Sequence, residues 1–308
     1  MKMRKPRKLN FGDTIGIVAP ASSFDIDKFK RGVELLKELG YKVKYERVIF
    51  DPGWSKPDHN RERAMQINRM FADKEIKVIL CAEAGYGSAE IISYLDKKVI
   101  RRNPKIFVGY SDITIILLYL QKLANMVVFH GPVVSGEIYE GMHQLTLEYL
   151  KRLFSEAKPL GELKFPQMIA FKPGKATGRL VGGNMSLIID SIGKPYRIRT
   201  AGSILFLEDI NEDYETIEKY FLRLKRAGKF RKINGLLLGR MLNSSGKDHD
   251  LRKIIEKLFK GRDIPVLYGF PSGHLRLHGG LHVTLPLGLS VTIDADMLSL
   301  AVVESAVT

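Results

Sequence analysis

Cysteine and tryptophan are nearly absent from this chain of 308 residues, which contains one of each. A single thiol, that of Cys81, cannot form a disulfide within the chain. No apolar run approaches the roughly 20 residues of a membrane-spanning helix. The apolar residues 14–20, which follow a basic N-terminal arm, are too few for a signal peptide and predict a buried first strand. The absences exclude a disulfide-stapled fold and favour a soluble protein of the reducing cytoplasm.

Motifs for nucleotide phosphates and for metals are also missing. Neither a G-x-G-x-x-G nor a G-x-x-x-x-G-K-[ST] pattern occurs. His274, His278 and His282 recur at every fourth position, but Gly279-Gly280 interrupts any helix there. On strands, each four-residue step would separate two of these histidines by about 13 Å, too far for one ion. We therefore predict no metal site.

Acidic residues are fewer than basic ones: the chain has 34 of the former and 49 of the latter, which gives a net charge of +15. Such a balance attracts nucleic acids, anionic membranes or acidic small substrates. The basic residues are scattered along the sequence and interleaved with acids, and no nucleic-acid motif is present. A generally basic surface is the favoured interpretation, with neither a nucleic acid nor a membrane as partner.

What the sequence does contain is an alternation of apolar strands and amphipathic helices in its first half. Continuous apolar runs of this kind predict a parallel sheet that helices cover on both faces. The expected strands are 14–19, 41–47, 78–81 and 106–108, and the expected helices are 25–39, 61–71, 88–95 and 113–123.

The segment 155–178 differs in composition, because it is rich in proline and glycine and has no lasting period. We interpret it as a linker between an N-terminal α/β domain (1–154) and a C-terminal domain (179–308). The second half predicts a mixed domain with paired strands at its end. Its expected strands are 203–207, 235–239, 266–269, 282–285 and 290–293, and its expected helices are 214–226 and 251–259.

The sequence Gly109-Tyr110-Ser111-Asp112 lies between an apolar strand and a helix. Such a turn lifts a serine hydroxyl out of the carboxyl edge of a sheet, where α/β folds place their active sites. The N–H of Asp112 would then lie at a helix N-terminus, able to donate to a developing oxyanion. Ser111 is a candidate nucleophile, with a simple helix cap as the alternative.

Partners for a nucleophile occur at the ends of other strands. Gly85 follows the third strand and offers a second backbone N–H, with a nucleotide-phosphate loop as the weaker alternative. Glu208 and His274 each follow an apolar strand and are candidates for an orienting carboxylate and a base. His130 is interpreted as a site-shaping or core histidine.

Together these motifs resemble the LD-carboxypeptidase family of serine peptidases, which includes the microcin C self-immunity hydrolases. The resemblance runs nearly from end to end, and the order of the motifs is more specific than any one of them. The matching segments are 12–22, 84–87, 107–114, 130–132, 182–187, 205–209, 273–274 and 284–288.

The resemblance implies a cytoplasmic homodimer that needs no cofactor and hydrolyses a small peptide with a Ser111–Glu208–His274 triad. Backbone N–H groups of Gly85 and Asp112 would hold the oxyanion. Substrate-binding candidates at matching positions are Tyr86, His130 and Asn184. The implied fold pairs an N-terminal α/β domain with a C-terminal mixed α/β domain that contains a small β-barrel. The implied reaction removes a C-terminal D-amino acid from a murein tetrapeptide across an L,D amide bond.

Two departures from the family pattern affect the substrate and the base. Glu83 and Glu90 stand where members commonly have arginine, which alters how a substrate carboxylate would be held. The family's spacing to Thr-Leu-Pro would select His278 as the base, whereas the Gly-Phe-Pro-Ser-Gly-His context selects His274, which we favour. An amidase for peptidyl- or aminoacyl-nucleotide conjugates is the alternative activity, and a non-catalytic basic binding protein is a more distant one.

Overall fold

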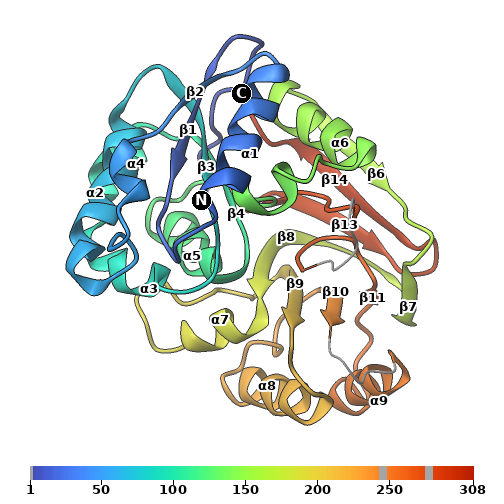
Figure 1. Ribbon diagram of the computed structural model, residues 1–308. Helices are drawn as coiled ribbons and strands as arrows, with labels where there is room; N and C mark the ends of the chain where they lie inside the picture. The colour runs from blue at the N-terminus through green and yellow to red at the C-terminus, as the bar shows by residue number, and fades with distance from the viewer. Residues whose placement is uncertain (1–2, 243–247, 275–279) are drawn as a thin grey trace.

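The computed structural model describes residues 3–242, 248–274 and 280–308. His278 therefore lies outside the described residues. Two sheets dominate the structure, one of six strands and one of eight, and helices pack against both (Figure 1). Within the described residues, no helix is both long enough and apolar enough to cross a membrane.

The six-stranded sheet has the order β12-β5-β4-β3-β1-β2. Strands β1 to β5 are parallel, as predicted, and only β12 runs antiparallel to its neighbour. Their bounds are β1 Thr14–Val18, β2 Lys42–Lys44, β3 Ile76–Cys81, β4 Ile106–Gly109, β5 Val128–His130 and β12 Leu285–Leu287.

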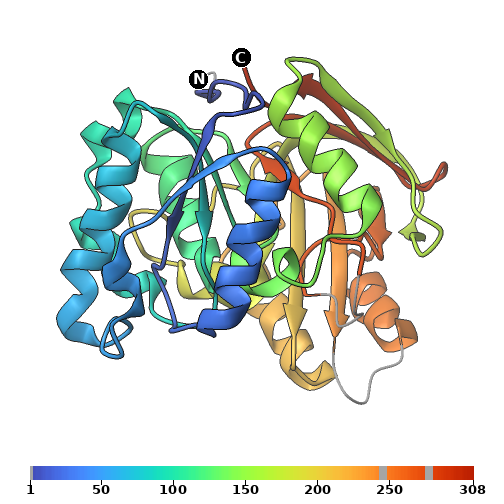
Figure 2. The same cartoon turned by 45° about the horizontal axis from the view of Figure 1, so that its top comes forward.

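Helices that cross between these strands cover the faces of the sheet (Figure 2). Asp25 begins the first of them by accepting hydrogen bonds from the N–H groups of Asp27 and Lys28, a typical N-cap. The helices of this half are α1 Ile26–Glu38, α2 Asn60–Ala72, α3 Ser88–Ile91, α4 Lys97–Arg102, α5 Thr114–Leu123 and α6 Gln144–Ser155. The predicted helices at 25–39, 61–71 and 113–123 match α1, α2 and α5, whereas the helix expected at 88–95 is split between α3 and a 3₁₀ turn at Ile92–Tyr94.

The eight-stranded sheet has the order β6-β14-β13-β8-β9-β10-β11-β7 and is mixed, as predicted. Its strands are β6 Pro159–Leu163, β7 Ile169–Lys172, β8 Lys175–Asn184, β9 Ser203–Ile210, β10 Gly235–Leu242, β11 Val266–Tyr268, β13 Ser290–Asp294 and β14 Ser299–Ser305. Helices α7 Met185–Asp190, α8 Tyr214–Arg226 and α9 Asp248–Leu258 accompany it. The small β-barrel expected in the C-terminal domain stays a prediction, because the strand order does not show whether the sheet closes on itself.

The segment 155–178, predicted to be a linker, is built into this second sheet. It holds β6 and β7, which form the two edges of the sheet, and the start of β8. Edge strands tolerate proline, and Pro159 is the first residue of β6. Only isolated side chains such as Leu160, Leu163 and Phe171 are buried, so the segment lacks the apolar run of a central strand.

The late strands also pair differently from the prediction. They do not pair with one another: β11 joins β10 and β7, β13 joins β8 and β14, and β12 joins β5 in the first sheet. All three residues of β12 are buried, which makes it an apolar cover for that edge. The C-terminal half of the chain thus supplies a strand to the N-terminal sheet.

Candidate active site

Ser111 lies directly beyond the carboxyl end of β4, whose four residues are all buried. Its φ is +56°, a left-handed conformation that is uncommon for a residue other than glycine. A 3₁₀ turn, Ser111–Ile113, follows and continues into α5. The predicted strand-turn-helix elbow is therefore present, and its strained backbone is typical of a functional position.

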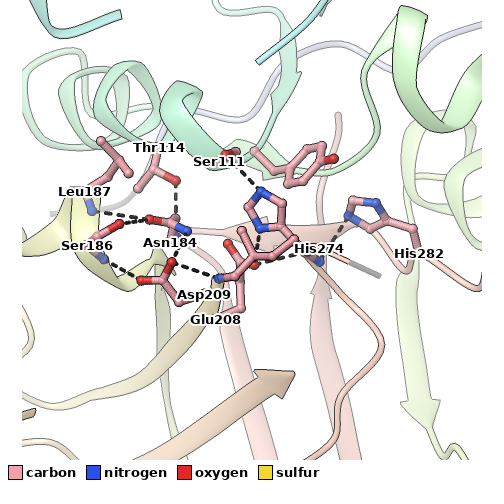
Figure 3. A network of polar contacts seen from close by, with 12 residues as sticks. Ser111, Thr114, Asn184, Ser186, Leu187, Glu208, Asp209, His274 and His282 are labelled. Atoms are coloured by element: carbon pink, nitrogen blue, oxygen red, sulfur yellow. Dashed lines mark hydrogen bonds and ion pairs between the residues drawn. The ribbon is translucent and has the colours of Figure 1, made fainter. Parts of the chain in front are cut away.

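Ser111, His274 and Glu208 form a continuous hydrogen-bonded chain (Figure 3). The Ser111 Oγ lies 3.0 Å from His274 Nε2, and His274 Nδ1 lies 2.8 Å from Glu208 Oε2. The same carboxylate oxygen accepts from the backbone N–H of His274 at 3.1 Å. With its Nδ1–H directed at the carboxylate, the imidazole presents a bare Nε2 to the hydroxyl, as a general base requires.

Burial shapes the protonation of this pair. Glu208 is fully buried at the carboxyl end of β9, and His274 is mostly buried. Burial disfavours the charged form of each group, but their mutual attraction and hydrogen bonding outweigh it. The pKa of Glu208 therefore lies below its ordinary value and the pKa of His274 above.

A second polar network lies behind the first and was missed from the sequence as a functional feature. His282 Nε2 accepts from the N–H of Gly273, the residue before His274, at 3.3 Å. His282 Nδ1 lies 3.7 Å from Glu137 Oε1, which accepts the hydroxyl of Tyr110, the residue before Ser111, at 2.7 Å. The network thus holds the backbone on the N-terminal side of both Ser111 and His274.

The charge of Glu137 fits that network. Burial raises the pKa of this carboxyl, but its contacts, which include the hydroxyl of Tyr110 on Oε1 and the N–H of Val133 on Oε2 at 3.2 Å, outweigh burial and lower the pKa. The only sequence signal for His282 was its place in a series of histidines at every fourth position, a spacing that can indicate a metal site. No group of three metal-binding side chains is found in the part of the chain that the structure describes.

The two backbone N–H groups predicted to hold an oxyanion lie in suitable local structure. Asp112 is in the first turn after the elbow, where N–H groups have no partner within the helix. Its carboxylate accepts from the N–H of Ser88 at 2.8 Å, which ties the elbow to α3. Gly85 has a φ of +98°, and a Cβ there would overlap the Ser22 side chain, so only glycine fits.

The three substrate-binding candidates differ in accessibility. Tyr86 is 75% exposed next to Gly85. Asn184 is buried, and its side-chain amide donates a hydrogen bond to Asp209 Oδ1 at 3.1 Å. His130 is completely buried. Burial lowers the pKa of His130 to about 3, so its ring is neutral and packs between Tyr110 and Phe206. For His130 and Asn184 this burial favours a supporting role over direct contact with a substrate.

The two acids that replace the family's arginines also lie near this edge. Glu83 is largely buried, which raises its pKa, and Ala84 N–H donates to it at 2.9 Å. Glu90 accepts from Asn60 at 3.0 Å and lies 3.9 Å from the buried guanidinium of Arg63. Arg63, which the sequence did not single out, is anchored on the carbonyl oxygens of Pro20 and Ala21. The acids thus belong to a structured surface beside the oxyanion candidates.

Comparison with known proteins matches this architecture to one family over most of the chain. A model of the LD-carboxypeptidase N-terminal domain matches residues 15–131, and one of the C-terminal domain matches residues 177–293. A probable murein peptide carboxypeptidase of Bacillus subtilis is 34% identical, over 99% of this chain and 95% of that protein. The microcin C7 self-immunity protein of Escherichia coli is 27% identical, over 96% of this chain and 94% of that protein.

A solved structure of a muramoyltetrapeptide carboxypeptidase has the same fold. The muramoyltetrapeptide carboxypeptidase from Oxalobacter formigenes superposes with a TM-score of 0.81 at 25% identity, covering 95% of this chain and 99% of that one.

Proposed function

Because the chain belongs to the LD-carboxypeptidase family, we propose that Ser111, His274 and Glu208 are the catalytic triad of a serine-type carboxypeptidase. The observation that supports this most directly is the hydrogen-bonded chain from the Ser111 hydroxyl through His274 to the buried Glu208 carboxylate. A helix cap would need no such chain, and the hydroxyl of Ser111 is directed at the ring of His274.

In the proposed mechanism, His274 Nε2 takes the proton from Ser111 Oγ as the oxygen attacks the carbonyl carbon of the scissile amide. Glu208 holds the ring and stabilises the imidazolium that forms. The N–H groups of Gly85 and Asp112 donate to the carbonyl oxygen as it becomes negative. His274 then gives its proton to the leaving amine. Water hydrolyses the acyl-enzyme by the same route, with His274 again acting as base.

The proposed substrate is a murein tetrapeptide that loses its terminal D-amino acid across an L,D bond. The identity to the B. subtilis murein peptide carboxypeptidase over nearly the whole chain supports this choice. The proposed setting is murein recycling by a homodimer in the cytoplasm, which rests on the family resemblance.

A second candidate substrate is a peptidyl- or aminoacyl-nucleotide conjugate. The relationship to the microcin C7 self-immunity protein supports it, as do Glu83 and Glu90. Acids at these positions remove two cations that would attract a free substrate carboxylate, and such a conjugate has none at its scissile end.

The test compares hydrolysis of an L,D-linked tetrapeptide with that of an aminoacyl-sulfamoyl adenylate by the purified protein. We expect Ser111→Ala to lower kcat by several orders of magnitude on whichever is turned over, leaving only the contribution of the oxyanion donors and binding. His274→Ala should match it, with His278→Ala as the matched control that keeps most of the activity. Full activity of Ser111→Ala, or a greater loss from His278→Ala, would overturn the assignment.

A further inference from the structure

The basic residues that look scattered along the sequence gather in space. Two hollows of about 410 Å³ each are lined by six lysines and arginines apiece, and no aspartate or glutamate lines either. Twelve of the 49 basic residues therefore gather around two hollows, instead of lying evenly among the acids.

The first hollow, which we call the α5 hollow, lies where the end of α5 meets the second sheet. It is also lined by Gln121, Tyr196 and Met3. Its cations come from α4, α5, β8 and the loop before β9, and they are Lys97, Arg101, Lys122, Arg179, Arg197 and Arg199. Within the described residues, all of these except Arg179 lack an ion pair.

The second hollow, which we call the arm hollow, lies at the amino ends of the parallel strands. It is formed by the N-terminal arm, the start of β3 and the loop before β4. Its cations are Lys5, Arg7, Lys74, Lys77, Arg102 and Lys105. Both chain termini lie together at this end of the molecule (Figure 2).

The two hollows are neighbours and form one surface, the basic belt. Arg101 and Arg102, the last residues of α4, line one hollow each. On the arm, Met3 lines the α5 hollow and Lys5 the arm hollow. A ligand that follows this surface passes from one hollow to the other across the arm and the end of α4.

Like charges lie close together in the belt, and acids offset them only in part, as Asp73 does beside Lys105. Burial, followed by the charges of Arg197 and Arg199, holds the pKa of Lys122 below its ordinary value. Burial, followed by the charge of Lys77, lowers the pKa of Lys105 to about 8. The acid beside the belt, Glu304, is already paired with Lys5 at 2.8 Å. Cations held together in this way are stabilised by an anion that lies among them.

The belt is separate from the proposed catalytic site. Lys105 precedes β4 and Ser111 follows it, so the two are at opposite ends of the strand, about 20 Å apart for six extended residues. Helix α5 likewise begins beside Ser111 and ends at Leu123, in the α5 hollow. A ligand on the belt therefore does not occupy the place of the peptide substrate.

The shape of the belt selects among anionic partners. An anionic membrane needs a flat face with apolar side chains to insert, but none of the exposed large hydrophobic residues lines either hollow. A small anion would fill one hollow and leave six cations in the other. Two adjoining hollows, each lined by several cations, suit an extended chain that carries one negative charge per unit, as a nucleic-acid backbone does.

We propose that the basic belt binds single-stranded nucleic acid through its phosphate backbone, as a second function that does not involve the triad. This differs from the expectation from sequence, in which a generally basic surface was favoured and no nucleic acid was a partner. The belt contains few aromatic side chains, Tyr196 being nearly buried, so binding is sequence-tolerant and dominated by charge.

The test uses a fluorescein-labelled 20-nucleotide RNA and the full chain, with anisotropy measured between 50 and 300 mM salt (about 0.05–0.3 M). Arg101→Gln/Arg102→Gln removes one cation from each hollow. The matched control, Lys253→Gln/Lys257→Gln on α9, removes the same two charges from a helix that lines neither hollow. Peptide hydrolysis by each variant reports whether the fold is intact.

We expect Arg101→Gln/Arg102→Gln to weaken RNA binding about 20-fold at 0.1 M salt and to reduce the salt slope by about 1.4, at roughly 0.7 per phosphate contact. The control should bind RNA within about twofold of the unmodified chain, and both variants should hydrolyse peptide normally. Equal weakening by the control would mean that the attraction is diffuse and would overturn the proposal. Absence of RNA binding would overturn it too, as would equally tight binding of polyglutamate or of phosphatidylglycerol vesicles.

Discussion

The left-handed backbone of Ser111 and the opposed pKa shifts of Glu208 and His274 describe a base that is already oriented before a substrate arrives. The charge and hydrogen bonds of His274 outweigh burial and lower the pKa of Glu208, which favours its ionised form. His274 must be neutral to accept the serine proton, and its raised pKa sets the pH above which that form dominates. Its basicity is thereby greater than that of a free histidine.

The pH dependence of kcat/KM follows from that shift. Below the pKa of His274 the ring is protonated and cannot act as base, so activity should rise with pH through a midpoint above the ordinary histidine value of about 6.5. Steady-state rates on the peptide substrate between acidic and mildly alkaline pH measure this midpoint. A midpoint at or below the ordinary value would mean that the Glu208 contact does not control the base.

At this scale, the three residues proposed as the triad could be singled out because each lies near the carboxyl end of an apolar strand in a recognisable context. The supporting residues could not be. Glu137 and His282 act through contacts between segments that are 145 residues apart in the chain, and nothing local in the sequence announces them. His130, interpreted from the sequence as a site-shaping or core histidine, is buried in β5, and the antiparallel β12 pairs with that strand.

Among the secondary-structure elements, the turn after β11 carries the most specific requirement. Gly273 has a φ of +96°, and a Cβ there would overlap the carboxylate of Glu208. Glycine at this position therefore lets the backbone approach closely enough for Glu208 to accept from both the N–H and the ring of His274.

Two glycine-to-alanine substitutions distinguish the effect of the close contact with Glu208 from the effect of a positive φ alone. Gly273→Ala should lower kcat at least 100-fold, because Glu208 must move away from His274. Gly193→Ala is the matched control, because Gly193 has a similar φ of +86° but open space where a Cβ would lie. Its substitution should lower the free energy of unfolding by only about 1 kcal/mol, through backbone strain. Kinetics and thermal unfolding of both variants provide the comparison. Equal kcat in the two would contradict the proposed constraint.

Edge elements account for most of the errors in the predicted fold. Central strands such as β3 and β4 are continuous apolar runs and were found at nearly their true positions. Strands β6 and β7 bury few side chains, and the proline and glycine residues of β6 and of the loops beside β7 are typical of a linker. Pairing partners, as for β12, depend on contacts that no local pattern encodes.

In the whole molecule, the two halves of the chain are joined by more than their covalent connection. The proposed triad takes Ser111 from the loop after a strand of the first sheet and Glu208 from the second sheet, and β12 returns from the C-terminal half to close the edge beside β5. We propose that 1–154 and 179–308 are two domains, each built around one of the sheets, with 159–178 assigned to the second sheet and not to a linker.

Dividing the chain tests this arrangement. Residues 1–154 alone lack β12 and leave the fully buried β5 with an open edge, so the fragment should aggregate. Co-expression with residues 155–308 should recover a soluble complex that hydrolyses peptide, since the cut falls at the last residue of α6, just before the exposed residues that lead to β6. Size-exclusion chromatography and the peptide assay measure both outcomes. A soluble, cooperatively unfolding 1–154 fragment would show that β12 is dispensable.

The positive φ of Ser111 has a consequence for how such an enzyme evolves. Its backbone geometry suits glycine better than serine, so selection for heat resistance alone would favour losing the hydroxyl. On the proposed mechanism, serine at this position lowers stability but supplies the nucleophile. The buried strand before it and the helix after it hold the backbone in this conformation. A lineage that no longer needed hydrolysis would be expected to lose this residue early, while the fold around it survived.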